Sequence, residues 1–349
     1  MTTLDFGGRK IGPGQPCFII AEAGVNHNGR LDLARRLVEV AARAGADAIK
    51  FQTFTAERLV TPDAPKAEYQ GRATGAAESQ YDMLRRLELS AAAHQELMTC
   101  CREQGILFMS TPFDEESADF LETLGVPGFK IASGEITNLP LLTHVARKGK
   151  PMIVSTGMAR LGEVEAAVEA ISAMGHRSYA LLHCVSDYPA SAADANLRAM
   201  HTLRAAFDVP VGYSDHTEGI EVALAAAALG ACIIEKHFTL DRSLPGPDHG
   251  ASLEPEELRR LVQGIRTVEA ALGHGRKEPT RGEASTAAAA RKSLAASRDI
   301  PAGTVLTDDL IAVKRPGTGL PPAMRPHLLG RTARVPIPAG SLLMLDMLA

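Results

Sequence analysis

Short apolar runs alternate with helical stretches along most of the chain, from Pro16 to about residue 273. Each run is rich in β-branched residues and precedes a stretch whose apolar positions recur at helical spacing and which ends near a glycine. Strands that are apolar on both faces are typical of parallel sheets covered by helices on both sides. The eight runs are CFIIAEAG, DAIKFQT, ILFMSTP, GFKIASGE, PMIVSTG, YALLHCVS, VPVGYSDH and CIIEKHF.

Eight strand-helix units in roughly 260 residues predict an α/β fold, a (β/α)8 or TIM barrel that forms a catalytic domain over residues 1–273. A doubly wound open sheet built from the same units is the alternative. A long polar segment, residues 54–90, interrupts the alternation after the second strand. Long insertions in barrels usually cover the site, so we expect this one on the loop above the barrel mouth.

The pattern changes after residue 273. Residues 274–290 are charged and rich in alanine, and they are predicted to form a linker. Residues 291–349 contain the turn sequence I-P-A-G twice, starting at Ile300 and at Ile337. Proline followed by glycine favours tight turns between short strands, so we predict a small, mostly β domain. Because a domain of this size is marginal alone, we expect it to pack against a barrel, its own or a partner's.

Composition narrows the class of protein. With 45% hydrophobic residues in 349, the chain can bury a real core, and a net charge of −4 argues against nucleic acid as a partner. Five cysteines without a C-x-x-C pair argue against a disulfide framework and against a thiolate zinc site. No segment is apolar and long enough to span a membrane, so we expect a cytoplasmic protein with no membrane partner. Only 4% of residues are aromatic, so binding should rest on polar side chains.

Polar side chains of functional types follow all eight predicted strands, where a barrel builds its active site. Lysines and hydroxyls that converge with helix N-termini suit an anion, so we expect a phosphate or carboxylate ligand. For any one serine or threonine, capping of the next helix is the commoner explanation. The residues are Glu22, Lys50, Thr111, Lys130, Ser133, Glu135, Ser155, Ser186, Tyr188, Ser214, His216, Glu235 and His237.

His216 and His237 follow the last two strands at equivalent depths, so their imidazoles could share one divalent ion such as Mn²⁺, Fe²⁺ or Zn²⁺. The alternative is that each is a hydrogen-bonded core histidine. Side chains alternate along a strand, so Glu235 shares a face with His237. There Glu235 either supports the metal site from below or makes a buried salt bridge, for example with Lys130. Glu22 and Glu135 are candidates for acid-base work.

Nine segments, in order over nearly the whole chain, resemble segments of one family, the sialic acid synthases. These enzymes are phosphoenolpyruvate-dependent nonulosonate synthases. The resemblance implies a TIM barrel joined to a C-terminal antifreeze-like (SAF) domain. It also implies a transferase that condenses phosphoenolpyruvate with an open-chain N-acetylmannosamine-type sugar, adds water at C2 and releases phosphate by C–O cleavage. The segments are FIIAEAGVNHNG, AIKFQT, FKIASGE, IVSTGM, LLHCVSDYP, VGYSDHT, IIEKHFT, LPGPDHGASLEP and VKRPGTG.

The resemblance also implies roles for individual residues. His216 and His237 would bind Mn²⁺, or Mg²⁺ or Co²⁺ in its place, to polarise the aldehyde. Glu22 would position the attacking water or the sugar, Glu135 and Asp248 would lie near the acceptor, and Tyr188 would line the sugar pocket. The phosphoenolpyruvate would be held by Lys50, Thr111, Lys130, Ser133, Ser155 and Ser214, with Ser186 at its edge.

Family architecture further implies a domain-swapped homodimer in which Arg315 reaches the partner's barrel and contacts the N-acetyl group. Ser186 departs from some synthases, which carry asparagine there. The first acceptor expected is N-acetylmannosamine, giving N-acetylneuraminate, and the second is 2,4-diacetamido-2,4,6-trideoxymannose, giving legionaminate; a 6-phosphorylated acceptor is a third.

Two rival functions stay open at this point. One is a Schiff-base sialic acid aldolase on the same barrel, with Lys50, Lys130 or Lys236 as the nucleophile. The other is a non-catalytic carbohydrate-binding protein, which the polar barrel mouth disfavours.

Overall fold

The computed structural model describes residues 3–75 and 78–349, and the chain divides into two compact units, one up to Gly273 and one from His274. In the first unit the sheet follows the order β5-β4-β3-β10-β9-β8-β7-β6, and all of its pairs are parallel. The strands are β3 (Phe18–Gly24), β4 (Ala48–Thr53), β5 (Leu107–Pro112), β6 (Phe129–Ile131), β7 (Met152–Ser155), β8 (Tyr179–Cys184), β9 (Val211–Asp215) and β10 (Ile233–His237).

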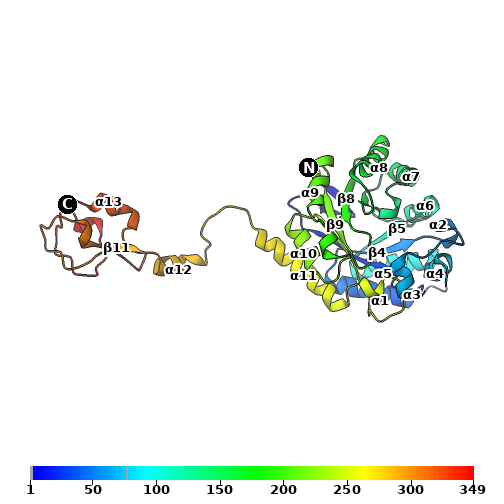
Figure 1. The fold of residues 1–349 in the computed structure, drawn as a ribbon, viewed down its shortest axis with the longest axis horizontal. Helices are drawn as coiled ribbons and strands as arrows, with labels where there is room; N and C mark the ends of the chain where they lie inside the picture. The colour runs from blue at the N-terminus through cyan, green and yellow to red at the C-terminus, as the bar shows by residue number, and fades with distance from the viewer. Residues whose placement is uncertain (1–2, 76–77) are drawn as a thin grey trace. The chain divides into compact units, whose positions relative to one another are not determined.

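This order runs around a ring, because β10 returns to pair with β3 and the two end strands, β5 and β6, also lie against each other. The predicted TIM barrel is therefore confirmed, and the doubly wound alternative is wrong. Helices surround the strands (Figure 1). They are α1 (Leu31–Ala44), α5 (Ala91–Gln104), α6 (Glu115–Leu124), α7 (Leu139–Arg147), α8 (Leu161–Ala173), α9 (Ala199–Phe207), α10 (Glu221–Ala228) and α11 (Pro255–Leu272), with 3-10 turns η1 (Ser133–Glu135), η2 (Ala192–Asp194) and η3 (His249–Ala251).

Local sequence explains the helix ends. The Ser90 hydroxyl accepts a hydrogen bond from Ala93 N and starts α5, and the Asp114 carboxylate does the same for α6 through Ser117 N. Gly45 ends α1 in the left-handed region, with φ 85°, where a side chain would be strained. Within residues 3–75 and 78–349, no helix combines the length and apolar character needed to cross a membrane.

A short antiparallel hairpin, β1 (Leu4–Phe6) and β2 (Arg9–Ile11), belongs to the barrel's lower interior. Its Leu4, Phe6 and Ile11 share one buried apolar cluster with the strand residues Phe18, Ile20, Ala48, Met109, Ile153, Ala180, Leu182, Cys232 and Ile233. Except for Leu182, those that lie in strands belong to the N-terminal halves of their strands, and Cys232 directly precedes β10. The hairpin therefore plugs the N-terminal end of the barrel, a role that the sequence pattern did not predict.

The long insertion after β4 is largely helical. It contains α2 (Ala56–Leu59), α3 (Glu68–Thr74) and α4 (Gln80–Leu87). Met83 and Leu87 of α4 pack with Phe54 and Val25 in a small apolar cluster of their own. The backbone of Arg86 also comes so close to Gly29 that a Cβ there would lie 2.2 Å from the Arg86 carbonyl oxygen. The insertion is thus anchored to the loop that follows β3.

The second unit is small and built from short antiparallel pairings. Its elements are α12 (Glu283–Ala290), β11 (Ser293–Ala296), η4 (Asp308–Leu310), β12 (Ile311–Lys314), η5 (Pro322–Met324), α13 (Arg325–Leu328) and η6 (Leu345–Met347). Strand β11 pairs with β12, and the two I-P-A-G sequences pair with each other, because Ile300 and Ile337 exchange backbone hydrogen bonds of 2.9 and 2.8 Å. The predicted linker contains helix α12, whose Ala288 carbonyl accepts a hydrogen bond from Gly317 N.

Candidate active site

The barrel interior changes from apolar to charged toward the C-terminal ends of the strands. Above the plugged end, five side chains project inward to form what we name the mouth cluster. It consists of Glu22 of β3, Lys50 of β4, Lys130 of β6, Ser214 of β9 and Glu235 of β10, and all five are buried. Period-two alternation places them there, since Ile20 and Ile233, two residues before Glu22 and Glu235, lie in the apolar interior below.

Glu235 lies between the two lysines. Its Oε2 is 3.8 Å from Lys50 Nζ, its Oε1 is 3.5 Å from Lys130 Nζ, and Ser214 Oγ donates to Oε1 at 2.8 Å. Lys50 Nζ is also 2.7 Å from Glu22 Oε2. The buried salt bridge with Lys130, one of the two roles predicted for Glu235, is therefore present, and it extends to Lys50.

Two hydroxyls complete the lysine environment. Lys50 donates to Thr111 Oγ1 at 3.2 Å, and Lys130 donates to Ser155 Oγ at 2.6 Å. The family resemblance implied that these hydroxyls and the lysines bind the same ligand. Two cations with hydroxyl donors around them form an anion-binding environment, although in this state two carboxylates balance their charge.

Burial and charge separate the two carboxylates. Burial raises the pKa of Glu22 to about 7, against the opposing effect of Lys50. Burial also works against the charge on Glu235, but Lys130 and Lys50 outweigh it and hold its pKa at about 2. Glu22 therefore titrates close to neutral pH, as a group that holds and releases a proton should, whereas Glu235 remains an anion.

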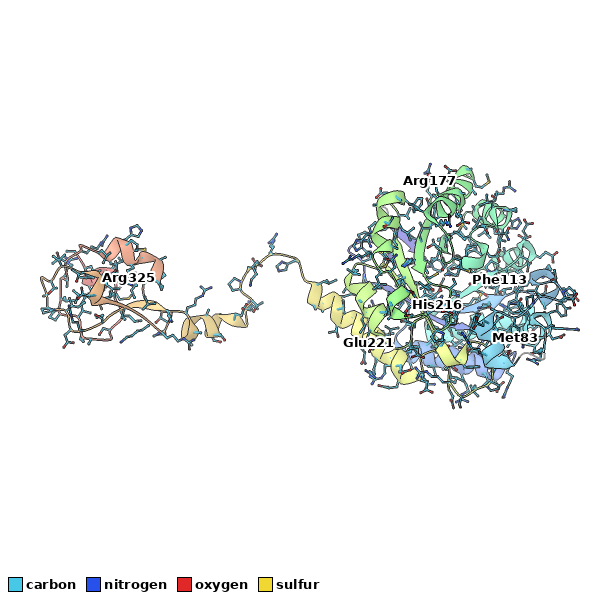
Figure 2. All side chains as sticks on the ribbon, viewed as in Figure 1. Met83, Phe113, Arg177, His216, Glu221 and Arg325 are labelled. Carbon is cyan, nitrogen blue, oxygen red and sulfur yellow. The ribbon has the colours of Figure 1, made fainter. Side chains whose placement is uncertain are left out.

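His216 and His237 are brought together at the mouth. Their ring centroids are 5.5 Å apart, and Figure 2 shows His216 in the middle of the barrel unit. His216 Nδ1 is 2.6 Å from the carbonyl oxygen of Val185, which can only accept, so this nitrogen carries the proton and Nε2 is left with a free lone pair. His237 Nδ1 is buried with no hydrogen-bond partner, and Asp248 Oδ2 lies 3.9 Å from it.

These histidines fit a divalent cation. Burial lowers the pKa of both rings, so both are neutral and have lone pairs to offer near neutral pH. Over the part of the chain that the structure describes, no group of three or more His, Cys, Asp or Glu side chains is arranged to hold a metal. Two imidazoles alone leave most coordination positions open to water or substrate, which is the arrangement of a catalytic rather than a structural site.

Ser133 and Ser186 lie together beside β8. Ser133 Oγ accepts from Gly157 N at 3.0 Å and is 2.9 Å from Cys184 Sγ. A Cβ on Gly157 would lie 2.3 Å from Ser186 Oγ, so only glycine fits there. Ser186 Oγ is itself buried without a hydrogen-bond partner, which leaves it available to a ligand.

Tyr188 and Asp248 adjoin the two histidines. The Tyr188 ring lies 4.2 Å from that of His216 and meets His237 edge-on at 5.6 Å. Asp248 is fully buried, and burial raises its pKa to about 6. Its backbone carbonyl accepts from Ser252 Oγ, which in turn accepts from Asn26 Nδ2 at 2.9 Å. The loop with Asp248 is thus tied to the segment that follows β3.

Three candidate residues lie outside this group of contacts. Glu135 is half-buried in η1, where its Oε2 accepts from Asn138 Nδ2 at 2.7 Å. Lys236, a candidate Schiff-base lysine, points to the outer face of β10 and pairs with Asp215 at 2.8 Å, so it cannot act in the mouth. Arg315 is exposed in the second unit.

Two further residues lie at the mouth: Gln52, which lies in the second strand run of the sequence but was given no role, and Tyr69, which sequence reasoning missed. Gln52 lies two residues after Lys50 on the same face of β4. A Cβ on Gly24 would lie 3.5 Å from Gln52 Nε2, 3.5 Å from His237 Cε1 and 3.2 Å from Glu22 Oε1, so these side chains surround Gly24. Its place near the end of the strand was read from the sequence, but the role of Gln52 was not. Tyr69 of α3 contacts Tyr188 with ring centroids 4.8 Å apart, and no sequence pattern shows which insertion side chain reaches the mouth.

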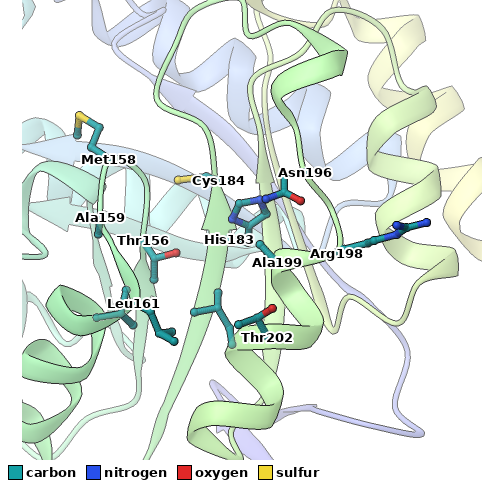
Figure 3. A pocket seen from close by; sticks show the side chains of 12 residues that line it. Thr156, Met158, Ala159, Leu161, His183, Cys184, Asn196, Arg198, Ala199 and Thr202 are labelled. Atoms are coloured by element: carbon teal, nitrogen blue, oxygen red, sulfur yellow. The ribbon is translucent and has the colours of Figure 1, made fainter.

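A cavity of about 430 Å³ flanks the mouth between α8 and α9. His183 and Cys184 of β8 line it, together with Thr156 and Met158, and the side chain of Arg198 points away from it (Figure 3). None of its lining residues belongs to the mouth cluster or the histidine pair. The cavity therefore adjoins the site through Cys184, which contacts Ser133, but it does not include the charged cluster or the histidines.

Comparison with known proteins identifies the family. A profile of the NeuB family matches residues 37–277, and one of the SAF domain matches residues 291–349. The chain belongs to the NeuB family. The resemblance drawn from the nine segments is confirmed.

Members of the NeuB family similar to this chain carry names of related synthases. The chain is 49% identical over 337 residues to the N,N'-diacetyllegionaminic acid synthase of Legionella pneumophila, covering 95% of each protein. It is 39% identical over 332 residues to the N-acetylneuraminate-9-phosphate synthase of Mus musculus, covering 95% of this chain and 92% of the other. The crystal structure of N-acetylneuraminic acid synthetase from Leptospira borgpetersenii in complex with citrate is similar with a TM-score of 0.73 and 40% identity, over 82% of this chain and 95% of the other. The chain is therefore an enzyme of the NeuB family, whose similar members are named as synthases.

Proposed function

We propose that this protein is an N,N'-diacetyllegionaminate synthase, which condenses phosphoenolpyruvate with 2,4-diacetamido-2,4,6-trideoxymannose. Identity supports this acceptor, because the chain is 49% identical to a synthase named for that product and 39% identical to one named for a phosphorylated neuraminate. The sequence alone favoured N-acetylmannosamine, so that acceptor becomes the second candidate.

The observation that carries the proposal is the mouth cluster beside the two histidines. Phosphoenolpyruvate has a phosphate and a carboxylate, and Lys50 and Lys130 offer one cation to each end of such an anion, with Thr111 and Ser155 as hydroxyl partners. Ser133, Ser186 and Ser214 would add further hydrogen bonds. Because Glu22 and Glu235 balance the charges of the lysines, binding the anion requires a shift in these ion pairs, which leaves Glu22 ionised and able to accept a proton.

In the proposed reaction, the π electrons between C2 and C3 of phosphoenolpyruvate form a bond from C3 to the aldehyde carbon of the open-chain sugar, and the aldehyde oxygen takes up a proton to become a hydroxyl. Water adds to C2, and the bond from C2 to the phosphate oxygen breaks, so inorganic phosphate leaves with that oxygen. Glu22 would hold the proton that the water gives up, since its pKa lies near neutral. His216 and His237 would hold Mn²⁺, with Mg²⁺ or Co²⁺ as substitutes, and such an ion supplies Lewis-acid polarisation of the aldehyde oxygen.

Tyr188, Asp248 and Glu135 would contact the acceptor. A domain-swapped homodimer in which Arg315 contacts the acetamido group in the partner's barrel belongs to the same proposal.

The test is a phosphate-release assay with phosphoenolpyruvate, Mn²⁺ and each of three sugars, with products identified by mass. The sugars are 2,4-diacetamido-2,4,6-trideoxymannose, N-acetylmannosamine and N-acetylmannosamine 6-phosphate. We expect the highest kcat/KM with the first sugar and no phosphate without a sugar. A preference for either of the other two would overturn the acceptor assignment.

A second assay separates this reaction from the aldolase reading. Borohydride with pyruvate should leave the mass of the protein unchanged, because no Schiff base forms in a synthase that uses phosphoenolpyruvate. A pyruvate adduct on Lys50 or Lys130 would instead identify an aldolase.

A further inference from the structure

Two aromatic rings link the insertion to the histidine pair. Tyr188 lies 4.2 Å from His216, and Tyr69 of α3 lies 4.8 Å from Tyr188, with planes inclined by 31°. Burial and then the negative charge of Asp248 raise the pKa of the Tyr69 phenol. The Tyr69 side chain is therefore within the electrostatic reach of the site, one ring further from the histidines than Tyr188.

The position of Tyr69 is fixed by polar contacts within the insertion. Lys66 Nζ donates to Thr74 Oγ1 at 2.9 Å and to the Gly75 carbonyl at 3.1 Å, and pairs with Glu78 at 3.2 Å. Gln70, next to Tyr69, accepts at Oε1 from Ala67 N at 3.0 Å. Helix α3 is thus fastened at both ends, so its ring is presented to Tyr188 in a defined place.

The charges of the insertion do not suit a phosphorylated sugar. Four of the five basic residues between positions 54 and 90 are ion-paired, with partners given in order: Arg58 with Asp114 and Glu116, Lys66 with Glu78, Arg72 with Glu68 and Arg86 with Glu78. The side chain next to Tyr188 is a phenol rather than a cation. Burying a phosphate against such a ring without a partner charge is costly, whereas methyl groups pack well on it.

We propose that Tyr69 determines acceptor specificity: its ring, together with that of Tyr188, forms an apolar wall for the non-reacting end of an uncharged acylated sugar. The inference rests on the proposed function. With the aldehyde at the histidines, a linear sugar extends past Tyr188 toward Tyr69. An acetamido methyl and the methyl of a 6-deoxy carbon are the groups that such a wall would receive.

Four variants test this: Tyr69→Ala, Tyr69→Phe, Tyr69→Arg and, as a matched control on the solvent side of α3, Glu68→Ala. For each, kcat and KM are measured with the three sugars, and KM is measured for phosphoenolpyruvate. We expect Tyr69→Ala to raise the KM for the diacetamido sugar by about tenfold or more and to leave that for phosphoenolpyruvate unchanged. Tyr69→Phe and Glu68→Ala should behave like wild type, and Tyr69→Arg should shift the preference toward the 6-phosphate by about tenfold.

The outcomes separate the two proposals. Wild-type protein that releases phosphate with none of the sugars refutes the proposed function and this inference with it. If the wild type is active and both Tyr69→Ala and Tyr69→Arg keep the sugar preference of the wild type, the inference is refuted and the proposed function stands. A rise in the KM for phosphoenolpyruvate equal to that for the sugar would also refute it, because it would indicate general damage to the mouth. If Tyr69→Ala fails to fold, Tyr69→Arg decides the matter, because a sugar preference equal to that of wild type in this variant would refute the inference.

Discussion

The two halves of the barrel interior differ in polarity: the lower half, at the N-terminal ends of the strands, is apolar, and the upper half, at their C-terminal ends, is charged. The lower half is apolar and closed by the hairpin, with Phe6 fully buried and its ring 5.9 Å from that of Phe18. The upper half buries two lysines and two carboxylates, which pair with one another and form hydrogen bonds with the hydroxyls of Thr111, Ser155 and Ser214. Buried ion pairs contribute little net stability, because desolvation opposes the attraction, whereas buried apolar area is the main favourable term. We therefore expect the apolar lower half to provide most of the stability and the charged upper half to carry the function.

The largest effect is expected from the histidine pair. His216→Ala should lower phosphate release by about a thousandfold or more, since one imidazole cannot hold a catalytic ion as two can. The midpoint of thermal unfolding should change little. The matched control is His201→Ala, an exposed histidine on α9. Turnover near the wild-type level in His216→Ala would break the assignment of function to the upper half.

The complementary change is in the plug. Phe6→Ala should destabilise the protein by about 3–5 kcal/mol, because it leaves a cavity in a closely packed apolar end. Below the unfolding temperature its kcat and KM should equal those of wild type. Urea unfolding and steady-state kinetics measure the two quantities, with Lys10→Ala on the exposed face of β2 as the control. An altered KM with unchanged stability would show that the two halves are not separate.

A third prediction concerns the pH dependence of stability. Burial lowers the pKa of His27 to about 3, so the folded protein keeps this ring neutral while the unfolded chain protonates it below about pH 6.5. Because only the unfolded state binds this proton, acid stabilises the unfolded state. The free energy of unfolding should therefore fall by up to about 1.4 kcal/mol per pH unit as the pH is lowered from 6.5 to 3.

In the folded protein, His27 Nδ1 accepts a hydrogen bond from Gly29 N at 3.0 Å. His27→Asn keeps an acceptor for this N–H and removes the imidazole that titrates. Urea unfolding at several pH values should give a shallower acid slope for this variant than for wild type. Parallel slopes would assign the acid sensitivity to other buried groups.

The sequence predicted the upper half better than the lower one. Period-two alternation identifies Glu235 and His237 as neighbours on one face, and the position of Lys50 and Lys130 near strand ends follows from the apolar runs. The hairpin was missed because strands of three residues, such as Leu4–Phe6, are too short to show a period. Tyr69 was missed because its contact with Tyr188 depends on how the insertion folds back, which local pattern does not specify.

The proposed role of the two lysines in the mouth cluster is to hold the phosphoenolpyruvate. Calorimetric titration of wild type, Lys130→Met and the surface control Lys10→Met with phosphoenolpyruvate alone tests it directly. We predict that Lys130→Met weakens binding by about a hundredfold or more, as expected when one partner of a buried charge-assisted contact is removed. Lys10→Met should bind as wild type does. Equal affinity in wild type and Lys130→Met would contradict the claim.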